Sequence, residues 1–566
     1  MLTTSYLLYL SGFYFNEMDR LGEDYVNFFV RMTSAEFYFR TAGLLHIPWF
    51  TPAMCGGGFQ FANPIDVTYS IPQLLSLLTN PLIAVYMTHV LFVLLGGVGT
   101  YLLSTAAPFR LSIWPATTTA VLFALNGFFM ARMITGHLNF HTFMLLPLIT
   151  WLILQNRTST SVFAGAGAGL VVVCGGAHLI IPIGISVLSI IVLASQFKEG
   201  PKVTQIATAI GLSSAVALGL AAAKLMAGYS LLSHFPRALY ELQGITSLAT
   251  SIWAPLVNLF GDVNVPSKVH GNWLLSSHEY ELSLSPFVLP GLALALWTGI
   301  RSQPRTLLKF SAAMAPLIAL VISVNFYHPA WHEWLKQLPV ISSSVSLFRW
   351  YASLLLVVAL IAGMGLQQLP TKWRLPMSLV IIIGTMSWQM LREPPWKILP
   401  KVDYATILDG LALSRIQGVT PITKLAVNTN SAGEVAKIHA ESDVKFTQGE
   451  SQVFCYEPIL GYRAERLNIN NLRVGTVTTR IGNELNMKNP ACYLYPAANQ
   501  CEPGDNFTID QTERMLAFTH YQPWSFEQPP YQRWANWVSL LSWIGLSMFL
   551  MLLGVNHVRG RNKQLN

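Results

Sequence analysis

Long apolar runs recur along the 566-residue chain and constrain its fold more than any other feature. A helix needs about 20 mainly apolar residues to cross a hydrocarbon core that is about 30 Å thick. The chain is 52% hydrophobic and only 11% charged, whereas charged residues make up about a quarter of an average soluble domain. We therefore predict a polytopic α-helical membrane protein.

The apolar runs predict about twelve transmembrane helices. The first is short for a span, and it lacks the basic residues and the cleavage site of a signal peptide. The expected spans are 1–15, 82–104, 113–133, 138–155, 162–178, 179–196, 206–228, 284–300, 307–324, 349–369, 375–391 and 534–554.

Basic residues in the short loops indicate the orientation in the membrane. With a cytoplasmic N-terminus, the cytoplasmic segments contain a single acid, Glu199, and many Lys and Arg residues. These are Arg110, Arg157, Lys198, Lys202, Arg301, Arg305, Lys309, Lys372, Arg374, Arg559, Arg561 and Lys563. The positive-inside rule therefore places both termini in the cytoplasm. The net charge of +8 reports this orientation and does not indicate a nucleic-acid partner.

All the long segments between spans then lie outside the cytoplasm. We expect a transmembrane domain over 1–391, with external loops at 16–81, 229–283 and 325–348. A soluble external domain follows at 392–533, and residues 534–566 form the last helix and a cytoplasmic tail. The first loop has short amphipathic runs, which predict re-entrant or interfacial helices.

The predicted domain at 392–533 is small and mixed or β-rich. Four of its apolar runs, "KLAVNT", "QVFCYEPIL", "VGTVTTRI" and "RMLAFTHY", are short and separated by turn residues, as in strands. The stretch "NPACYLYPAANQCEPGD" closes a Cys492–Cys501 disulfide if it faces an oxidising compartment. Reduced thiols are the alternative.

Three acids follow the first apolar segment closely, in "NEMDRLGEDYVNFFVR". They are Asp19, Glu23 and Asp24. An acid held beside apolar surface at the membrane boundary has its pKa raised towards the working range of a general base. The alternative is an ordinary interfacial anion that is solvated by water.

The order of several motifs resembles the YfhO-like branch of the GT-C membrane glycosyltransferases, over most of the first 370 residues. The family has an acid after the first span, as in "GED" here, and then a segment similar to "GLLHIPWFTPAMCGGGFQFANPIDVTYSIPQLL". Further similar stretches are "GHLNFHTFMLLPLITWLIL", "CGGAHLIIP", "HEYELSLSPFVLPGLALAL" and "LPVISSSVSLFRWYASLLLVVALIAGMGL". The chain departs from the family pattern at Ala352–Ser353 and at Glu281–Leu282.

The resemblance implies a GT-C-like fold and a reaction. Such enzymes move a sugar from a polyprenyl-phosphate donor in the membrane lipid to an extracytoplasmic acceptor, which is a glycan, a lipid or a protein. It implies a bacterial cytoplasmic (inner) membrane, with the large loops periplasmic or extracellular. It also places the catalytic acid in the first external loop. We expect Asp24 to be the base that takes the acceptor's proton, with Asp19 and Glu23 as alternatives.

Three cations are candidates for the donor phosphate. Arg349 opens the tenth predicted span at its outer end, where its guanidinium would hold a phosphate with several donors. Lys224 lies inside the seventh span, and intramembrane charges are functional candidates by default. Arg237 follows that span. The alternative for Arg349 and Lys224 is that they extend to the lipid headgroups.

The candidates for contacts to the sugar or acceptor are His137, His141, Asp66, Glu279 and Trp273. The two histidines are spaced i, i+4, which puts both on one face of an α-helix and is also a spacing of zinc sites. Hydrogen bonding to sugar or phosphate fits better, because no third ligand is fixed. The alternative for Trp273 is that it belongs to an interfacial aromatic belt and does not contact a sugar. We expect no cofactor and no metal, although the external acids have the oxygen ligands for a divalent ion.

Two other functions compete with the enzyme. Twelve spans with both ends inside also suit a transporter or a flippase for lipid or polysaccharide. Such proteins usually show internal symmetry and acids at mid-membrane, whereas the acids here gather outside. The second alternative is a non-catalytic assembly or adhesion protein in which 392–533 does the binding.

Overall fold

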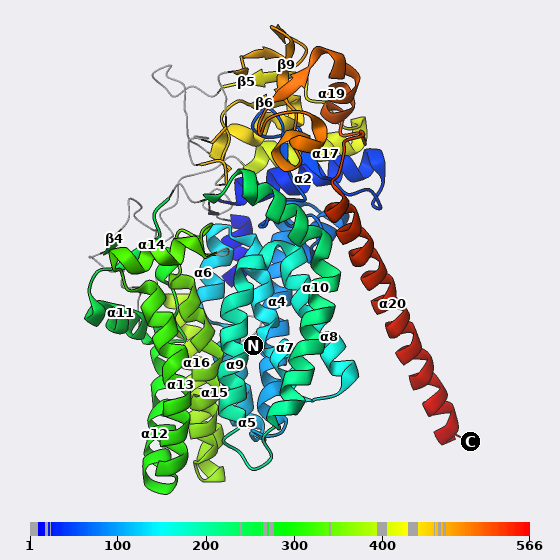
Figure 1. Ribbon diagram of the computed structural model, residues 1–566. Coiled ribbons are helices and arrows are strands. Elements are labelled where there is room, and N and C mark those ends of the chain that lie inside the picture. Colours follow the sequence, from blue (N-terminus) through cyan, green and yellow to red (C-terminus); the bar gives the residue numbers. More distant parts are fainter. Residues whose placement is uncertain are drawn as a thin grey trace.

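A computed structural model describes the chain apart from a few short segments. The described residues are 9–16, 21–22, 24–237, 240–261, 263, 269–270, 277–338, 341–392, 404–427, 440–457, 459–461, 466–467 and 471–565. Within them, a bundle of long apolar helices is covered at one end by a small unit of helices and short strands, which we call the cap (Figure 1).

The helices of the bundle are apolar along most of their length. In the described residues, eight helical stretches are long and apolar enough to cross a membrane, so the chain is a polytopic helical membrane protein. The count of twelve stays a prediction, because residues 1–8 of the first expected span lie outside the described residues. The bundle helices are α4 (Pro81–Thr105), α5 (Ile113–Ala124), α6 (Gly127–Thr135), α7 (Leu146–Leu154), α8 (Thr158–Val171), α9 (Ile180–Ala194), α10 (Val203–His234), α12 (Leu289–Ser302), α13 (Pro304–Asn325), α15 (Leu355–Gln367), α16 (Thr371–Leu391) and α20 (Pro530–Leu565).

The helices α8 and α9 are separated by a sharp turn at Gly175, whose φ is +86°. A Cβ atom there would meet the Ile65 carbonyl oxygen at 2.6 Å. Only glycine therefore allows both the turn and the close approach of the first loop. This contact attaches the segment around Asp66 to the bundle.

Helix α2 (Asp24–Ala42) lies across the end of the bundle, beneath the cap (Figure 1). We expected re-entrant or interfacial helices in this loop, and in α2 almost every residue from Tyr25 to Phe37 is buried against protein. Its depth relative to a membrane stays a prediction. The sequence "YVNFFVRM" is apolar except at Asn27 and Arg31, and a helix with this pattern needs cover on nearly every face. The bundle covers one side of α2 and the cap covers the other.

The cap combines the described residues between 404 and 527 with the loop after α2. One sheet has the order β6 (Glu450–Gln452), β5 (Lys424–Ala426), β7 (Gly475–Thr476), and the other β10 (Asn506–Thr508), β9 (Glu484–Lys488), β8 (Arg480–Ile481). Helices α17 (Tyr404–Gln417), α18 (Ala491–Leu494) and α19 (Thr512–Thr519) complete this part. The loop contributes a hairpin, β1 (Phe50–Thr51) with β2 (Gly58–Phe59), and α3 (Ile71–Leu78). The remaining elements are α11 (Leu248–Phe260), α14 (Pro329–Gln337) and the strand pair β3 (Gly244–Ile245) with β4 (Val269–His270).

Strands form in or beside three of the four runs that predicted them. The prediction of a strand for the fourth run, "RMLAFTHY", is wrong. Its first six residues lie in helix α19. The side chains of Thr508 and Gln511 form a capping box just before it, and this arrangement starts a helix rather than a strand.

Two disulfides and a buried ion pair hold the cap together. The expected Cys492–Cys501 disulfide is present, and Cys55 of the first loop is bonded to Cys455. Beside this second disulfide, Arg31 of α2 pairs with Glu457, and their side chains are only 2% and 3% exposed. The domain predicted at 392–533 is therefore bound covalently and electrostatically to the loop at 16–81.

The Arg31 guanidinium has a partner for each of its nitrogens. Nε donates to Asn27 Oδ1 at 2.7 Å and Nη1 to the Phe59 carbonyl at 3.1 Å, while Nη2 donates to Glu457. Asn63 also donates to Glu457 Oε2 at 3.2 Å. Because a buried charge without a partner is expensive, this network fixes where the cap sits on α2.

We predict that Arg31→Met lowers the free energy of unfolding by about 3–5 kcal/mol, because it leaves the Glu457 carboxylate buried without its cation. The double variant Arg31→Met, Glu457→Leu should lose less than Arg31→Met alone. Unfolding in detergent, followed by tryptophan fluorescence, measures both. Arg110→Ala is the control, since Arg110 and Glu199 form a pair with side chains 66% and 56% exposed, and we expect it to change stability by less than about 1 kcal/mol. Equal effects of Arg31→Met and Arg110→Ala would contradict the prediction.

Candidate functional site

The candidate site lies where the start of α2 meets the end of α6. The Gly22 amide donates to the Ile134 carbonyl at 3.0 Å. A Cβ atom on Gly22 would lie 1.8 Å from the Thr135 carbonyl oxygen. Gly136 has φ +104°, and a Cβ there would lie 2.5 Å from the Tyr25 amide nitrogen. Two glycines thus permit the backbone contact that places Asp24 beside His137.

Asp24 and His137 form a hydrogen-bonded pair. Nε2 of His137 lies 2.6 Å from Oδ2 of Asp24, and Nδ1 of His137 lies 3.2 Å from Nη1 of Arg132. A guanidinium only donates, so Nδ1 must accept. In the neutral ring Nε2 therefore carries the proton and donates it to the Asp24 carboxylate.

The surroundings of this pair keep it as carboxylate and neutral imidazole. Burial acts to raise the pKa of Asp24, but His137, His278 and a side-chain hydrogen bond from Tyr456 together lower it below its ordinary value. Burial lowers the pKa of His137 to about 4, despite the opposing effect of Asp24. The predicted rise in the pKa of Asp24 is therefore wrong in direction, because the charge interactions with His137 and His278 and the hydrogen bonds from His137 and Tyr456 together outweigh burial.

A second carboxylate, Glu279, is held between two arginines. Arg132 reaches it at 2.9 Å (Nη1 to Oε1) and 3.0 Å (Nη2 to Oε2). Arg349 binds it through Nε at 2.8 Å to Oε2 and also through Nη2. Burial acts to raise the pKa of Glu279, but the two guanidiniums hold it well below its usual value. Arg132 is fully buried, whereas the Arg349 side chain is 29% exposed, so Arg349 is the cation that a ligand can reach.

The ring of Phe140 joins these groups. The guanidinium carbons of Arg132 and Arg349 lie 5.1 and 5.2 Å from its centroid, within cation–π range. The His137 ring stacks on it at 5.5 Å and the His178 ring lies at 4.6 Å. Phe140 thus fixes the cations and imidazoles without using their hydrogen-bonding atoms.

Two imidazole nitrogens beside the site are buried and have no protein partner among the described residues. They are Nε2 of His178 and Nδ1 of His278. Buried polar atoms are usually satisfied by protein, water or ligand. These two atoms are therefore available to the oxygens of a ligand bound beside Arg349.

One group in the site has the residue types of a metal centre. Ligand atoms of His137, His278 and Glu279 all lie within 4.8 Å of one another, and two histidines with one glutamate form a common zinc set. However, Glu279 already neutralises Arg132 and Arg349, and His137 already donates to Asp24. A divalent ion would have to break these contacts and sit beside two guanidiniums, so the fit is poor.

Four of the predicted site residues come together here. Asp24 was expected as the base, Arg349 as a phosphate ligand, and His137 and Glu279 as contacts to the sugar or acceptor. Asp24 and His137 form one pair and Glu279 and Arg349 another, with Arg132 between them. Glu279 anchors the two arginines. Each of its carboxylate oxygens already accepts from both Arg132 and Arg349.

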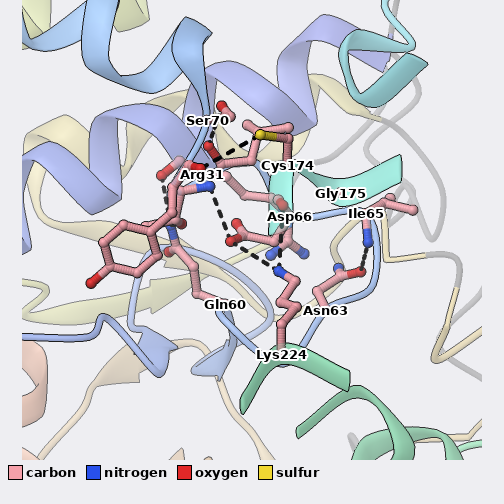
Figure 2. Close-up of polar contacts among 12 residues, drawn as sticks. Arg31, Gln60, Asn63, Ile65, Asp66, Ser70, Cys174, Gly175 and Lys224 are labelled. Carbon is pink, nitrogen blue, oxygen red and sulfur yellow. Dashed lines mark hydrogen bonds and ion pairs between the residues drawn. The ribbon is translucent and has the colours of Figure 1, made fainter. Parts of the chain in front are cut away.

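Lys224 and Asp66 pair with each other instead, in a buried network that Figure 2 shows. Nζ of Lys224 lies 3.6 Å from Asp66 Oδ2 and 3.4 Å from the Asp66 carbonyl oxygen. Their side chains are 4% and 1% exposed. Arg31, Gln60 and Asn63 lie around them. This pair connects α10 to the first loop, and its burial argues against direct contact with a donor phosphate.

His141 points away from His137. Residues Leu138–Leu145 form a 3₁₀-helix, in which positions i and i+4 do not share a face. The His141 ring packs on Phe92 at 4.6 Å and is fully buried. The expectation that an α-helix puts both histidines on one face is therefore wrong, whereas a ligand role for His141 stays a prediction.

The remaining candidates lie elsewhere. Arg237 follows α10 and is within electrostatic range of Glu457 and Lys336. Asp19, Glu23 and Trp273 lie outside the described residues.

Sequence reasoning missed three residues of the site. Arg132 carried a usable signal, because it is a charge inside a predicted span. His278 stands next to Glu279 in the "HEYE" motif but was not chosen. Tyr456 had no signal, because only folding brings the cap residue to Asp24.

Comparisons with known proteins add no assignment: no family model, curated protein or solved structure matches the chain.

We predict that His137→Ala raises the pKa of Asp24, because it removes the main group that opposes burial. The carboxyl stretching band of Asp24, isolated by subtracting spectra of Asp24→Asn, reports this pKa in an infrared titration. His141→Ala is the matched control, since His141 packs on Phe92, and the pKa of Asp24 should not change. An unchanged pKa in His137→Ala would show that this hydrogen bond does not control Asp24.

Proposed function

We propose that the chain is a membrane glycosyltransferase of the GT-C type, which moves a sugar from a polyprenyl-phosphate donor to an extracytoplasmic acceptor. The observation that carries the proposal is the pairing of Asp24 with His137 beside the partly exposed Arg349. A proton acceptor and an anion-binding guanidinium are the two groups that transfer from a lipid phosphate requires. The motif order that resembles the YfhO-like branch agrees with this reading.

Each group has a role in a single displacement. The acceptor oxygen bonds to the anomeric carbon of the sugar while the bond from that carbon to the phosphate oxygen breaks. Asp24 takes the proton of the acceptor hydroxyl, and polyprenyl phosphate leaves with its charge near Arg349. Positive charge develops on the sugar ring in the transition state, and the ionised Asp24 stabilises it.

The low pKa of Asp24 is compatible with this role. A weak base is effective when the proton moves late, after the acceptor oxygen has begun to bond and become acidic. His137 keeps the carboxylate oriented and ionised, and Tyr456 extends this control to the cap. Glu279 holds Arg132 and Arg349 in place, so it is a positioning residue. No metal is part of the proposal.

The orientation has independent support from the cysteines and the basic loops. Both disulfides, Cys55–Cys455 and Cys492–Cys501, lie in the cap, and disulfides persist in oxidising compartments. The Arg110–Glu199 pair connects two loops at the opposite end of the bundle, where Lys and Arg residues gather as the positive-inside rule requires of a cytoplasmic face. The cap side is thus proposed to face outwards, in the periplasm or the extracellular space of a bacterial inner-membrane protein.

A transporter or flippase remains the alternative. The buried Lys224–Asp66 pair is the observation that favours it, since ionisable groups inside a bundle mark transport pathways. These residues close the contact between α10 and the first loop, however, and every residue that Figure 2 labels belongs to the packing between bundle and cap.

We predict that Asp24→Asn lowers glycan transfer at least 10²-fold, the usual minimum for losing a general base. The assay is the cell-envelope glycan profile, together with transfer from a polyprenyl-phosphate sugar in proteoliposomes. Glu199→Gln, an exposed acid at the opposite end, is the control and should leave transfer unchanged. Normal transfer by a well-folded Asp24→Asn protein would overturn the proposal. A transport defect confined to Lys224 or Asp66 variants would support the alternative.

The orientation gives a separate prediction. Leu45 follows α2 and is 97% exposed, while Val203 begins α10 at the other end and is 84% exposed. A membrane-impermeant maleimide should label Leu45→Cys in intact cells, and Val203→Cys only after the cells are broken. Background is low, because the other cysteines are paired and Cys174 is buried. The reverse labelling pattern would place Asp24 in the cytoplasm and exclude the function.

A further inference from the structure

A cavity of about 220 Å³ opens in the cap, between the loop that follows α2 and the segment that follows α19. Most of its wall is aromatic. The rings include those of Tyr38, Trp49, Phe50, Tyr521, Trp524 and Phe526. We call it the aromatic cavity. No part of the Asp24 site lines it.

The rings hold one another in fixed orientations. Phe526 meets Phe50 edge to face at 4.8 Å and Trp49 at 5.8 Å, and Trp524 lies 5.5 Å from Phe50. Aromatic pairs at these separations stabilise their geometry. Trp49 and Trp524 are only partly buried. A ligand that enters from solvent therefore meets a rigid aromatic wall.

The cavity also has polar groups at its rim. His46 and Gln522 are exposed and line the same cavity. The Tyr521 hydroxyl, by contrast, is buried away from solvent and has no partner among the described residues.

A sugar ring combines the two properties that this wall requires. One face of a pyranose presents C–H groups that pack on aromatic rings, and its edge presents hydroxyls that bond to rim groups such as His46 and Gln522. We propose that the aromatic cavity binds a sugar unit of the acceptor, and that the acceptor is an oligosaccharide or polysaccharide. This inference rests on the proposed function and specifies its acceptor class.

The length of the acceptor follows from helix α2. Asp24 is the first residue of α2 and Tyr38 lies near its end, 14 residues later. At 1.5 Å per residue the two positions are about 20 Å apart along the helix. A monosaccharide cannot reach both, whereas a chain of several sugars can bind the cavity and present one end to Asp24.

Binding tests the cavity without any transfer. The probes are hexasaccharides of glucose, mannose and N-acetylglucosamine and their monosaccharides, titrated calorimetrically into the full chain in detergent. At least one hexasaccharide should bind more tightly than its monosaccharide, and Trp524→Ala should weaken it about tenfold. Trp537→Ala, on a 58% exposed residue of α20, is the control and should bind as the parent does. Failure of every saccharide to bind, equal binding by Trp524→Ala, or competition by undecaprenyl phosphate would overturn the inference.

Transfer distinguishes failure of this inference from failure of the proposed function. Trp524→Ala should transfer to a short acceptor at the parental rate and lose at least about tenfold with a long one, whereas Asp24→Asn should lose both. If Asp24→Asn is inactive but Trp524→Ala keeps the preference for long acceptors, the function stands and the cavity has no such role. If Asp24→Asn is active, the function fails, and the binding titration still decides whether the cavity takes a glycan.

Discussion

The close backbone contact between Gly22 and the end of α6 is the constraint on which the site depends. It brings the first residue of α2 against a turn of the bundle, and so places a carboxylate beside His137. A side chain at Gly22 would overlap the Thr135 carbonyl, and the α2 helix would have to move away. The contact also starts α2 on its path under the cap, where the Arg31–Glu457 pair holds it.

Charge pairing decides the chemistry of the site. Asp24 and Glu279 are both buried carboxylates with lowered pKa values, but they have different partners. Two guanidiniums neutralise Glu279, whereas Asp24 is paired with His137 and Tyr456. Two carboxylates can thus differ in chemistry because of their surroundings.

The cap is part of the site. Its residue Tyr456 bonds to Asp24, and the neighbouring residues Cys455 and Glu457 bind the cap to the first loop. The same unit forms the aromatic cavity at the far end of α2. One buried helix therefore links the proposed reaction centre to the proposed acceptor subsite, and the rigidity of that helix sets the distance between them.

The membrane class and the long helices could be predicted from the sequence, because apolar length is a local property. Asp24, His137, Glu279 and Arg349 were candidates from the sequence, and the structure brings them together, but their roles stay predictions. The burial of α2, the helix at "RMLAFTHY", the Lys224–Asp66 pair and the inward turn of His141 could not. Each depends on what lies on the other side of a helix, and residues hundreds of positions away provide it. The sequence alone determined that this chain crosses a membrane and that acids gather near its first span. Only the tertiary structure decided that the pKa of Asp24 is lowered rather than raised, since a pKa is set by neighbours that folding brings together.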